Sequence, residues 1–144
     1  MQIDILLLTK TSRLPEKMSN NAAGYDIFAD IAEPVILKPF DRILIPSGFA
    51  LAIPEGFEAQ IRPRSGLAFK YGITVLNSPG TIDSDYRGEV KILLINLSQT
   101  DFQILPQMRI AQLIISQHAE IEFSLKPELA LTARGSGGFG HTSH

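Results

Sequence analysis

Short apolar runs, divided by proline and glycine, dominate the pattern along the chain. Residues 57–62 alternate apolar and polar side chains, which is the period of a half-buried strand. No window of a dozen residues keeps the 3.6-residue period of a helix. We therefore expect strands over residues 3–8, 35–37, 42–46, 49–53, 57–62, 89–97, 102–105, 109–117 and 121–125.

The one expected helix is short. Residues 65–71 have room for one or two turns, with Ser65 as the candidate N-cap. Many short strands with turns between them are typical of a β sandwich, barrel or jelly roll. The 144 residues suffice for one domain with its own core. The predicted fold is therefore all-β, with a jelly-roll-like barrel or sandwich and one short helix.

Residues 92–95 place apolar side chains on both faces of their expected strand. Such a strand lies either deep in the core or at a contact between subunits, and the pattern favours neither.

The composition changes at Arg134. Four of the seven residues 134–140 are glycine, and Phe139 is the one aromatic side chain of the segment. Glycine loses the most conformational entropy on ordering, which predicts a flexible tail over 134–144 after a single β domain over 1–133. The tail is either a disordered end or, because it carries an arginine and a ring, a lid over a phosphorylated aromatic ligand.

Charge and composition exclude several classes of protein. The chain has 13 basic and 15 acidic residues and no cysteine. It is therefore no strongly basic nucleic-acid or membrane-surface binder, and it has no disulfide, thiol nucleophile or cysteine-bound zinc. No apolar run approaches the ~20 residues of a membrane span. We expect a soluble cytoplasmic protein that binds neither nucleic acid nor membrane.

Residues 63–68 read Pro-Arg-Ser-Gly-Leu-Ala and place Arg64, Ser65 and Gly66 where a strand gives way to the helix. A guanidinium, a hydroxyl and backbone N–H groups at a helix start suit a phosphate chain. A capped turn with a surface arginine has the same composition. The G-x-x-x-x-G-K-[ST] pattern of a P-loop does not occur in the chain.

Residues 80–89 read Gly-Thr-Ile-Asp-Ser-Asp-Tyr-Arg-Gly-Glu. In an extended segment Asp83 and Asp85 would share one face, where close carboxylates can hold a cation or bind a water. A solvated hairpin is the alternative interpretation.

Two polar residues interrupt apolar strand-like runs. Asp26 is the single charge within residues 23–29, where a charge is usually paired, close to a metal, or exposed at a strand edge. Gln112 lies between two isoleucines, and its amide needs hydrogen-bonding partners. Strict alternation places Arg109 on the opposite face, together with Ala111 and Leu113.

The order of these segments is more specific than any one of them. Ala-Gly-Tyr-Asp, Pro-Arg-Ser-Gly-Leu-Ala, Gly-Thr-Ile-Asp-Ser-Asp-Tyr-Arg-Gly-Glu, Arg-Ile-Ala-Gln-Leu and Arg-Gly-Ser-Gly-Gly-Phe-Gly follow one another between residues 23 and 142. This series resembles the five-motif pattern of the trimeric dUTPases. The resemblance implies a jelly-roll-like fold, a homotrimer with shared active sites, and Mg²⁺-assisted hydrolysis of dUTP to dUMP and pyrophosphate. It also implies a role in limiting uracil in DNA and in supplying dUMP for thymidylate synthesis.

The resemblance also implies roles for single residues. Asp83 matches the general base that activates water, Tyr86 matches the ring beneath the deoxyribose, and Asn77 matches the asparagine of the uracil pocket. Asp26 matches the aspartate that helps to hold the water shell of the metal. The residues that match phosphate-binding or tail positions are Arg64, Ser65, Gly66, Gln112, Arg134, Ser136, Gly137 and Phe139.

One departure and two alternatives accompany the resemblance. After Phe139 and Gly140 the family often has two hydroxyl residues, where this chain has His141 and Thr142. A dCTP deaminase-like enzyme of the same fold would need a base, usually glutamate, that activates water at the ring carbon. A binding module would keep the pocket and act by contacting a partner.

Overall fold

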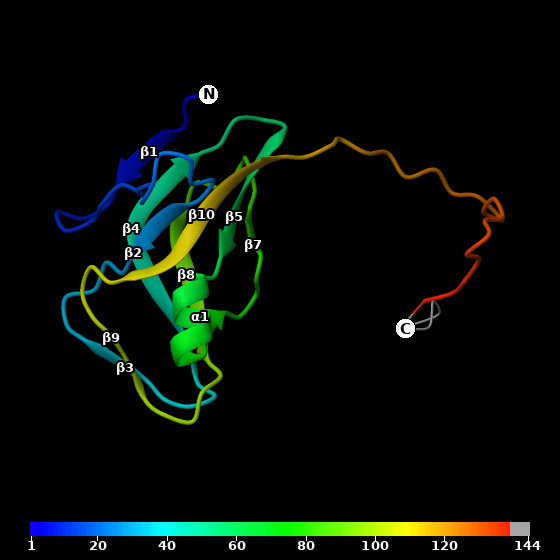
Figure 1. The fold of residues 1–144 in the computed structure, drawn as a ribbon. Helices are drawn as coiled ribbons and strands as arrows, with labels where there is room; N and C mark the ends of the chain where they lie inside the picture. Colours follow the sequence, from blue (N-terminus) through cyan, green and yellow to red (C-terminus); the bar gives the residue numbers. More distant parts are fainter. Residues whose placement is uncertain (139–144) are drawn as a thin grey trace.

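The strands of this computed structural model form an antiparallel β body, from which the C-terminal residues lead away (Figure 1). The structure describes residues 1–138. Its helix is α1 (Ser65–Tyr71). Its strands are β1 (Asp4–Leu7), β2 (Tyr25–Phe28), β3 (Val35–Leu37), β4 (Arg42–Ala52), β5 (Phe57–Arg62), β6 (Ile73–Val75), β7 (Gly80–Ile82), β8 (Glu89–Asn96), β9 (Phe102–Ile104) and β10 (Arg109–Gln117).

Two four-stranded sheets make up most of the body. One has the order β1-β4-β8-β6 and the other the order β2-β10-β5-β7, while β3 and β9 form a small third sheet. All named pairs of strands are antiparallel. The predicted all-β fold with one short helix is therefore confirmed.

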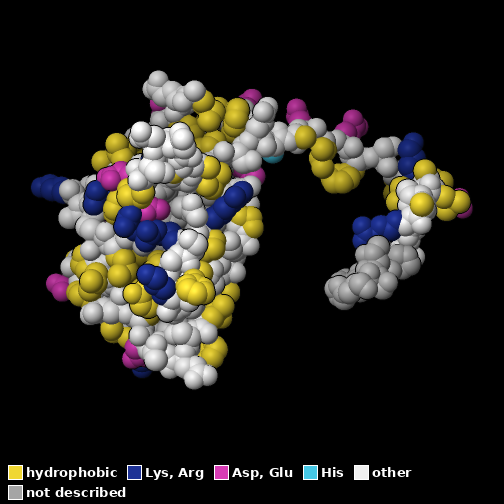
Figure 2. Space-filling view, in the orientation of Figure 1, with side chains coloured by type: hydrophobic (Ala, Val, Ile, Leu, Met, Phe, Trp, Pro, Cys, Tyr) yellow, Lys and Arg dark blue, Asp and Glu magenta, His cyan; other side chains and the backbone are white. Residues whose placement is uncertain are grey.

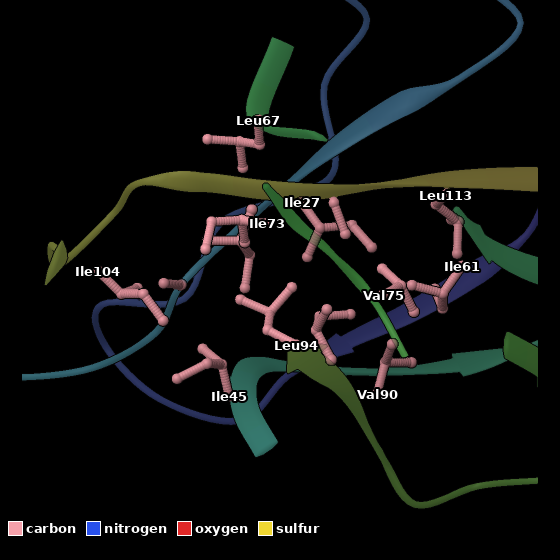
Figure 3. Close-up of a cluster of buried hydrophobic side chains, with 14 of the residues drawn as sticks. Ile27, Ile45, Ile61, Leu67, Ile73, Val75, Val90, Leu94, Ile104 and Leu113 are labelled. Carbon is pink, nitrogen blue, oxygen red and sulfur yellow. The ribbon is translucent and has the colours of Figure 1, made fainter. Parts of the chain in front are cut away.

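The core fills the space between the sheets (Figure 3). Alternation along β8 buries Ile92 and Leu94 completely, whereas Leu93 and Ile95 are only half-buried. Leu44 of β4, which pairs with Leu93 of β8, is 53% exposed. One face of β8 thus belongs to the deep core, and its other face is partly open in the single chain.

Two local predictions were wrong. Residues 121–125 form no strand, because no strand of the described chain lies beside them to pair with their backbone. Ser65 is the first residue of α1 and not its N-cap; Arg64 occupies the cap and makes no side-chain capping hydrogen bond. The helix ends at Gly72, whose positive φ of 67° allows the left-handed C-cap.

The strand boundaries differ elsewhere in detail. Residues 42–46 and 49–53, expected as two strands, lie almost wholly in β4, which continues through a register shift between Pro46 and Ala50. The three-residue strands β6 and β7 were not expected, since each is too short to show a period. No helix within residues 1–138 is long and apolar enough to cross a membrane.

Candidate functional site

A cavity of about 280 Å³ opens between β7 and β8. Asn77, Asp83 and Tyr86 line it together, although β7 separates the first from the other two in the chain. Apolar side chains from several strands form much of the remaining wall, among them Ile61, Val75 and Leu93. A mostly apolar hollow with a few convergent polar groups is the usual form of a small-molecule site.

Asn77 lies in the turn between β6 and β7. The Ser78–Pro79 peptide bond in this turn is cis, and Gly80 follows it. A Cβ at position 80 would lie 3.1 Å from Asn77 Nδ2, which is closer than nine in ten real Cβ contacts. Gly80 therefore leaves the space that the Asn77 amide occupies beside the cavity.

Asp83 and Tyr86 belong to a turn, so the extended segment predicted for Asp83 and Asp85 was wrong. The backbone N–H of Tyr86 donates to Asp83 O at 3.2 Å. Arg87 Nη1 reaches back to Ser84 O at 2.6 Å and to Tyr86 O at 2.9 Å. These hydrogen bonds hold the Asp83 carboxylate and the Tyr86 ring beside the same cavity.

The Tyr86 ring folds over Gly88. A Cβ on Gly88 would overlap the phenol ring, and the phenol donates from Oη to Glu89 O at 3.1 Å. Tyr86 as a whole residue is 47% exposed. One side of this half-exposed ring is thus packed against backbone, and the other is available to a flat or sugar-like ligand.

A second group of site residues gathers around Asp26, whose side chain is 13% exposed. Arg64 Nε lies 3.3 Å and Arg109 Nη1 3.2 Å from the same carboxylate oxygen, Oδ2. Arg64 Nη1 also donates to Arg109 O at 2.9 Å. Two guanidinium groups share one carboxylate, so the group carries a net charge of +1, which attracts an anion. Lys and Arg side chains gather on the face of the molecule that carries α1 (Figure 2).

Gln112 lies directly opposite Asp26 in the β2–β10 ladder. Its Nε2 donates to Pro63 O at 2.9 Å, which ties β10 to the residue before Arg64. Ser65 and Gly66 follow as exposed residues at the start of α1. The structure thus brings Asp26, Arg64, Gln112 and the start of α1 together.

The structure does not bring all predicted site residues together within one chain. None of Asp26, Arg64, Ser65, Gly66 or Gln112 lines the cavity that holds Asp83. In the tail, Arg134 Nε donates to Gly137 O at 2.7 Å, and the segment with Ser136 and Gly137 lies away from the β body (Figure 1). Phe139 and His141 lie outside the described residues.

Sequence reasoning missed three polar side chains that line the cavity, those of Thr81, Glu89 and Lys91. Lys91 Nζ lies 3.7 Å from Glu89 Oε2, and Glu89 Oε1 accepts a hydrogen bond from Gly48 N at 3.0 Å. The alternation along β8 places Glu89, Lys91 and Leu93 on one face. The alternation of these three residues with apolar ones was visible in the sequence, and it indicates that Glu89, Lys91 and Leu93 lie side by side on β8.

The donor set suits Mg²⁺ bound through water and phosphate. Within residues 1–138, no three His, Asp or Glu side chains are close enough together to hold a metal ion by themselves. Mg²⁺ keeps several waters and takes many of its ligands from phosphates, so it needs no such cage. Both ion pairs of Asp26 use Oδ2, and no described residue donates a hydrogen bond to Oδ1. Oδ1 can therefore accept a hydrogen bond from a metal-bound water.

Comparison with known proteins decides the family. The dUTPase family model matches residues 10–143. The chain belongs to the dUTPase family. The deoxyuridine 5′-triphosphate nucleotidohydrolase of Chlamydia pneumoniae is 58% identical over 136 residues, which cover 94% of each chain. That of Orientia tsutsugamushi (strain Ikeda) is 55% identical over 130 residues, covering 90% of this chain and 88% of the relative.

Solved dUTPase structures have the same fold. A dUTPase variant of Staphylococcus bacteriophage 80alpha with bound dUpNHpp has a TM-score of 0.85 and 28% identity over 97% of each chain. A dUTPase variant of phage phi11 of S. aureus, described for its coordination of a structural Mg(II) ion, has a TM-score of 0.79 and 26% identity. That alignment covers 90% of this chain and 99% of the phage chain. The chain is thus a jelly-roll enzyme of the dUTP diphosphatase type, which hydrolyses dUTP to dUMP.

Proposed function

We propose that this chain hydrolyses dUTP by Mg²⁺-assisted attack of water at the α-phosphate. In this role it limits uracil incorporation into DNA and supplies dUMP for thymidylate synthesis. The observation that carries the proposal is the turn that holds Asp83 and Tyr86 beside the Asn77 cavity. One turn thereby supplies a carboxylate and a ring next to a pocket that is large enough for a base.

In the proposed arrangement the nucleoside enters this cavity. Asn77 and the neighbouring backbone bind the uracil edge, and the sugar lies on the free side of the Tyr86 ring. The ring is held from behind by Gly88 and by its hydrogen bond to Glu89 O. A 2′-hydroxyl would lie against this ring without a hydrogen-bonding partner, which disfavours UTP.

Asp83 acts as the general base. Its carboxylate takes one proton from a water while the water oxygen forms a bond to the α-phosphorus. The bond between the α-phosphorus and the bridging oxygen breaks, and pyrophosphate leaves with that oxygen and the bonding electron pair. Mg²⁺, when bound together with the nucleotide, would supply positive charge to the phosphate oxygens. Asp26 is the side chain that would hold its water shell, through Oδ1.

The phosphate chain is bound by the second group of residues. Arg64, Ser65 and Gly66 provide a guanidinium, a hydroxyl and backbone N–H groups, and Gln112 provides an amide. In the closed state Arg134, Ser136 and Gly137 of the tail add contacts to the phosphates, and Phe139 covers the uracil. We assign residues 1–133 to the β domain and residues 134–144 to this lid.

We also propose a homotrimer with active sites shared between subunits. The group around Arg64 and the cavity of Asp83 have no lining residue in common in one chain, which leaves each of them incomplete. The segment after β10 also carries apolar side chains without cover: Phe123, Leu125, Leu129 and Leu131 are between 86% and 100% exposed. A neighbouring subunit would cover these side chains and bring the two groups together. The cytoplasmic location stays a prediction.

Hydrolysis in oxygen-18-labelled water tests the position of attack. Label in dUMP supports attack at the α-phosphate, and label in pyrophosphate contradicts it. We expect Asp83→Asn to bind dUpNHpp and to lose most turnover, since general-base catalysis contributes about 10²–10⁴-fold. Asp85→Asn, which removes the neighbouring carboxylate of the same turn, is the matched control and should keep its activity.

A further inference from the structure

Arg109 is a third charged side chain in the group around Asp26. It is the first residue of β10, and its side chain is 41% exposed. Its guanidinium contacts the carboxylate oxygen that also contacts Arg64, at 3.2 Å and 3.3 Å respectively. The family resemblance assigned roles to Arg64 and Asp26 and left Arg109 without one.

A β-bulge places Arg109 in this position. On β2, Phe28 and Ile27 are adjacent, yet their partners on β10 are Arg109 and Ala111, with Ile110 as the extra residue. Strict alternation would have put Arg109 on the face of Ala111, which is buried in the core. The bulge instead moves it to the face of Asp26 and Gln112, so the predicted alternation was wrong at this point. Bulges often re-aim a side chain beside a functional site.

The contacts of Arg109 bear on Arg64 in two ways. The Arg109 carbonyl accepts a hydrogen bond from Arg64 Nη1 at 2.9 Å, so the bulged backbone helps to orient the Arg64 side chain. The Arg109 guanidinium also balances the charge of Asp26. Without it, Asp26 and Arg64 would form a neutral pair with little attraction for phosphate.

We propose that Arg109 is a positioning residue for triphosphate binding: it shares the Asp26 carboxylate and so leaves the Arg64 guanidinium available to phosphate. The inference rests on the proposed function, because it takes Arg64 as a phosphate ligand. Arg109 acts through Asp26 and requires no contact of its own with the nucleotide.

The test compares binding of dUpNHpp and of deoxyuridine to the full chain. Arg109→Gln should weaken dUpNHpp binding by about tenfold and leave deoxyuridine binding unchanged, because only the former carries phosphates. Arg109→Lys keeps the charge and should retain most of the affinity. Arg42→Gln removes an exposed arginine at the start of β4 and should bind both ligands as the unmodified chain does.

A double-mutant cycle separates positioning from direct contact. If Arg109 acts through Asp26, Arg109→Gln should have a clearly smaller effect in an Asp26→Asn background, since no carboxylate then remains to compete with phosphate for the Arg64 guanidinium. Equal effects in both backgrounds would overturn the positioning role. Normal binding of dUpNHpp by Arg109→Gln would overturn the inference altogether. Failure of the unmodified chain to bind either ligand would contradict the proposed function instead.

Discussion

Gly24 lies against the side-chain amide of Gln112, so closely that a Cβ at position 24 would overlap Gln112 Oε1. The two residues are far apart in the chain and belong to different motifs of the family pattern. Their contact explains why a glycine precedes the Tyr25 and Asp26 pair. The space beside Gly24 lets Gln112 turn toward Pro63 O, to which it donates at 2.9 Å.

Replacement of Gly24 by alanine should therefore act through Gln112. The added methyl group displaces the amide, and overpacking of this kind costs about 1–3 kcal/mol. We expect a lower melting temperature and weaker binding of dUpNHpp. The double variant Gly24→Ala with Gln112→Ala should be no less stable than Gln112→Ala alone. A double variant that is less stable by the full cost of Gly24→Ala would show that the overlap with Gln112 is not the cause.

The packing of Tyr86 predicts how the enzyme distinguishes dUTP from UTP. Tyr86→Ala should lower the ratio of kcat/KM for dUTP to that for UTP by about tenfold, which is about 1.4 kcal/mol of discrimination. Gly88→Ala should have the same direction of effect, because its Cβ displaces the ring. Tyr86→Phe keeps the ring and loses only the hydrogen bond to Glu89 O, so it should keep the ratio. An unchanged ratio in Tyr86→Ala would remove Tyr86 from sugar recognition.

Asn96 is a polar residue that stabilises the fold and lies outside the candidate site. Its side chain is fully buried, and Nδ2 donates to Leu37 O at 3.0 Å and to Thr100 O at 2.8 Å. Asn96→Ala leaves these carbonyl groups without their donor, at a cost of about 1–3 kcal/mol for a buried acceptor. Asn96→Asp should destabilise the fold at least as much at neutral pH, since a carboxylate cannot donate to either carbonyl. Denaturant unfolding measures both effects. Unchanged unfolding midpoints would show that the hydrogen bonds of the Asn96 side chain do not stabilise the fold.

The tail and the assembly can be tested together. A chain that ends at Ala133 should keep the mass of a trimer by light scattering and lose mainly kcat, because the lid excludes water after the nucleotide has bound. A full-length chain that stays monomeric under assay conditions, yet is fully active, would contradict shared sites. A truncated chain with full kcat would contradict the lid.

The strands that can be predicted from the sequence are those whose own residues alternate between apolar and polar side chains. β5 alternates apolar and polar side chains along its whole length, and its predicted bounds coincide with the observed ones. β6 and β7 have three residues each and exist because β8 and β5 pair with them. Their existence depends on a partner distant in the chain, which local reasoning does not contain.

Two errors in the sequence reading have the same origin. Residues 121–125 alternate like a strand, yet nothing in the described single chain pairs with them. Strict alternation along β10 predicts the wrong face for Arg109. The bulge at Ile110 that changes its face becomes visible only when β10 is aligned with β2. The order of the motifs was sufficient to indicate the family. The contacts between motifs, such as that of Gly24 with Gln112, needed the fold.

The most direct test of the central claim is pyrophosphate release from dUTP, measured with and without Mg²⁺ and beside dCTP, dTTP and UTP. We predict Mg²⁺-dependent release from dUTP alone, with dUMP as the second product, and its loss in Asp83→Asn. Release of ammonia from dCTP with dUTP untouched would contradict the proposed reaction in favour of a deaminase. Tight binding of dUTP without turnover would contradict it in favour of a binding module.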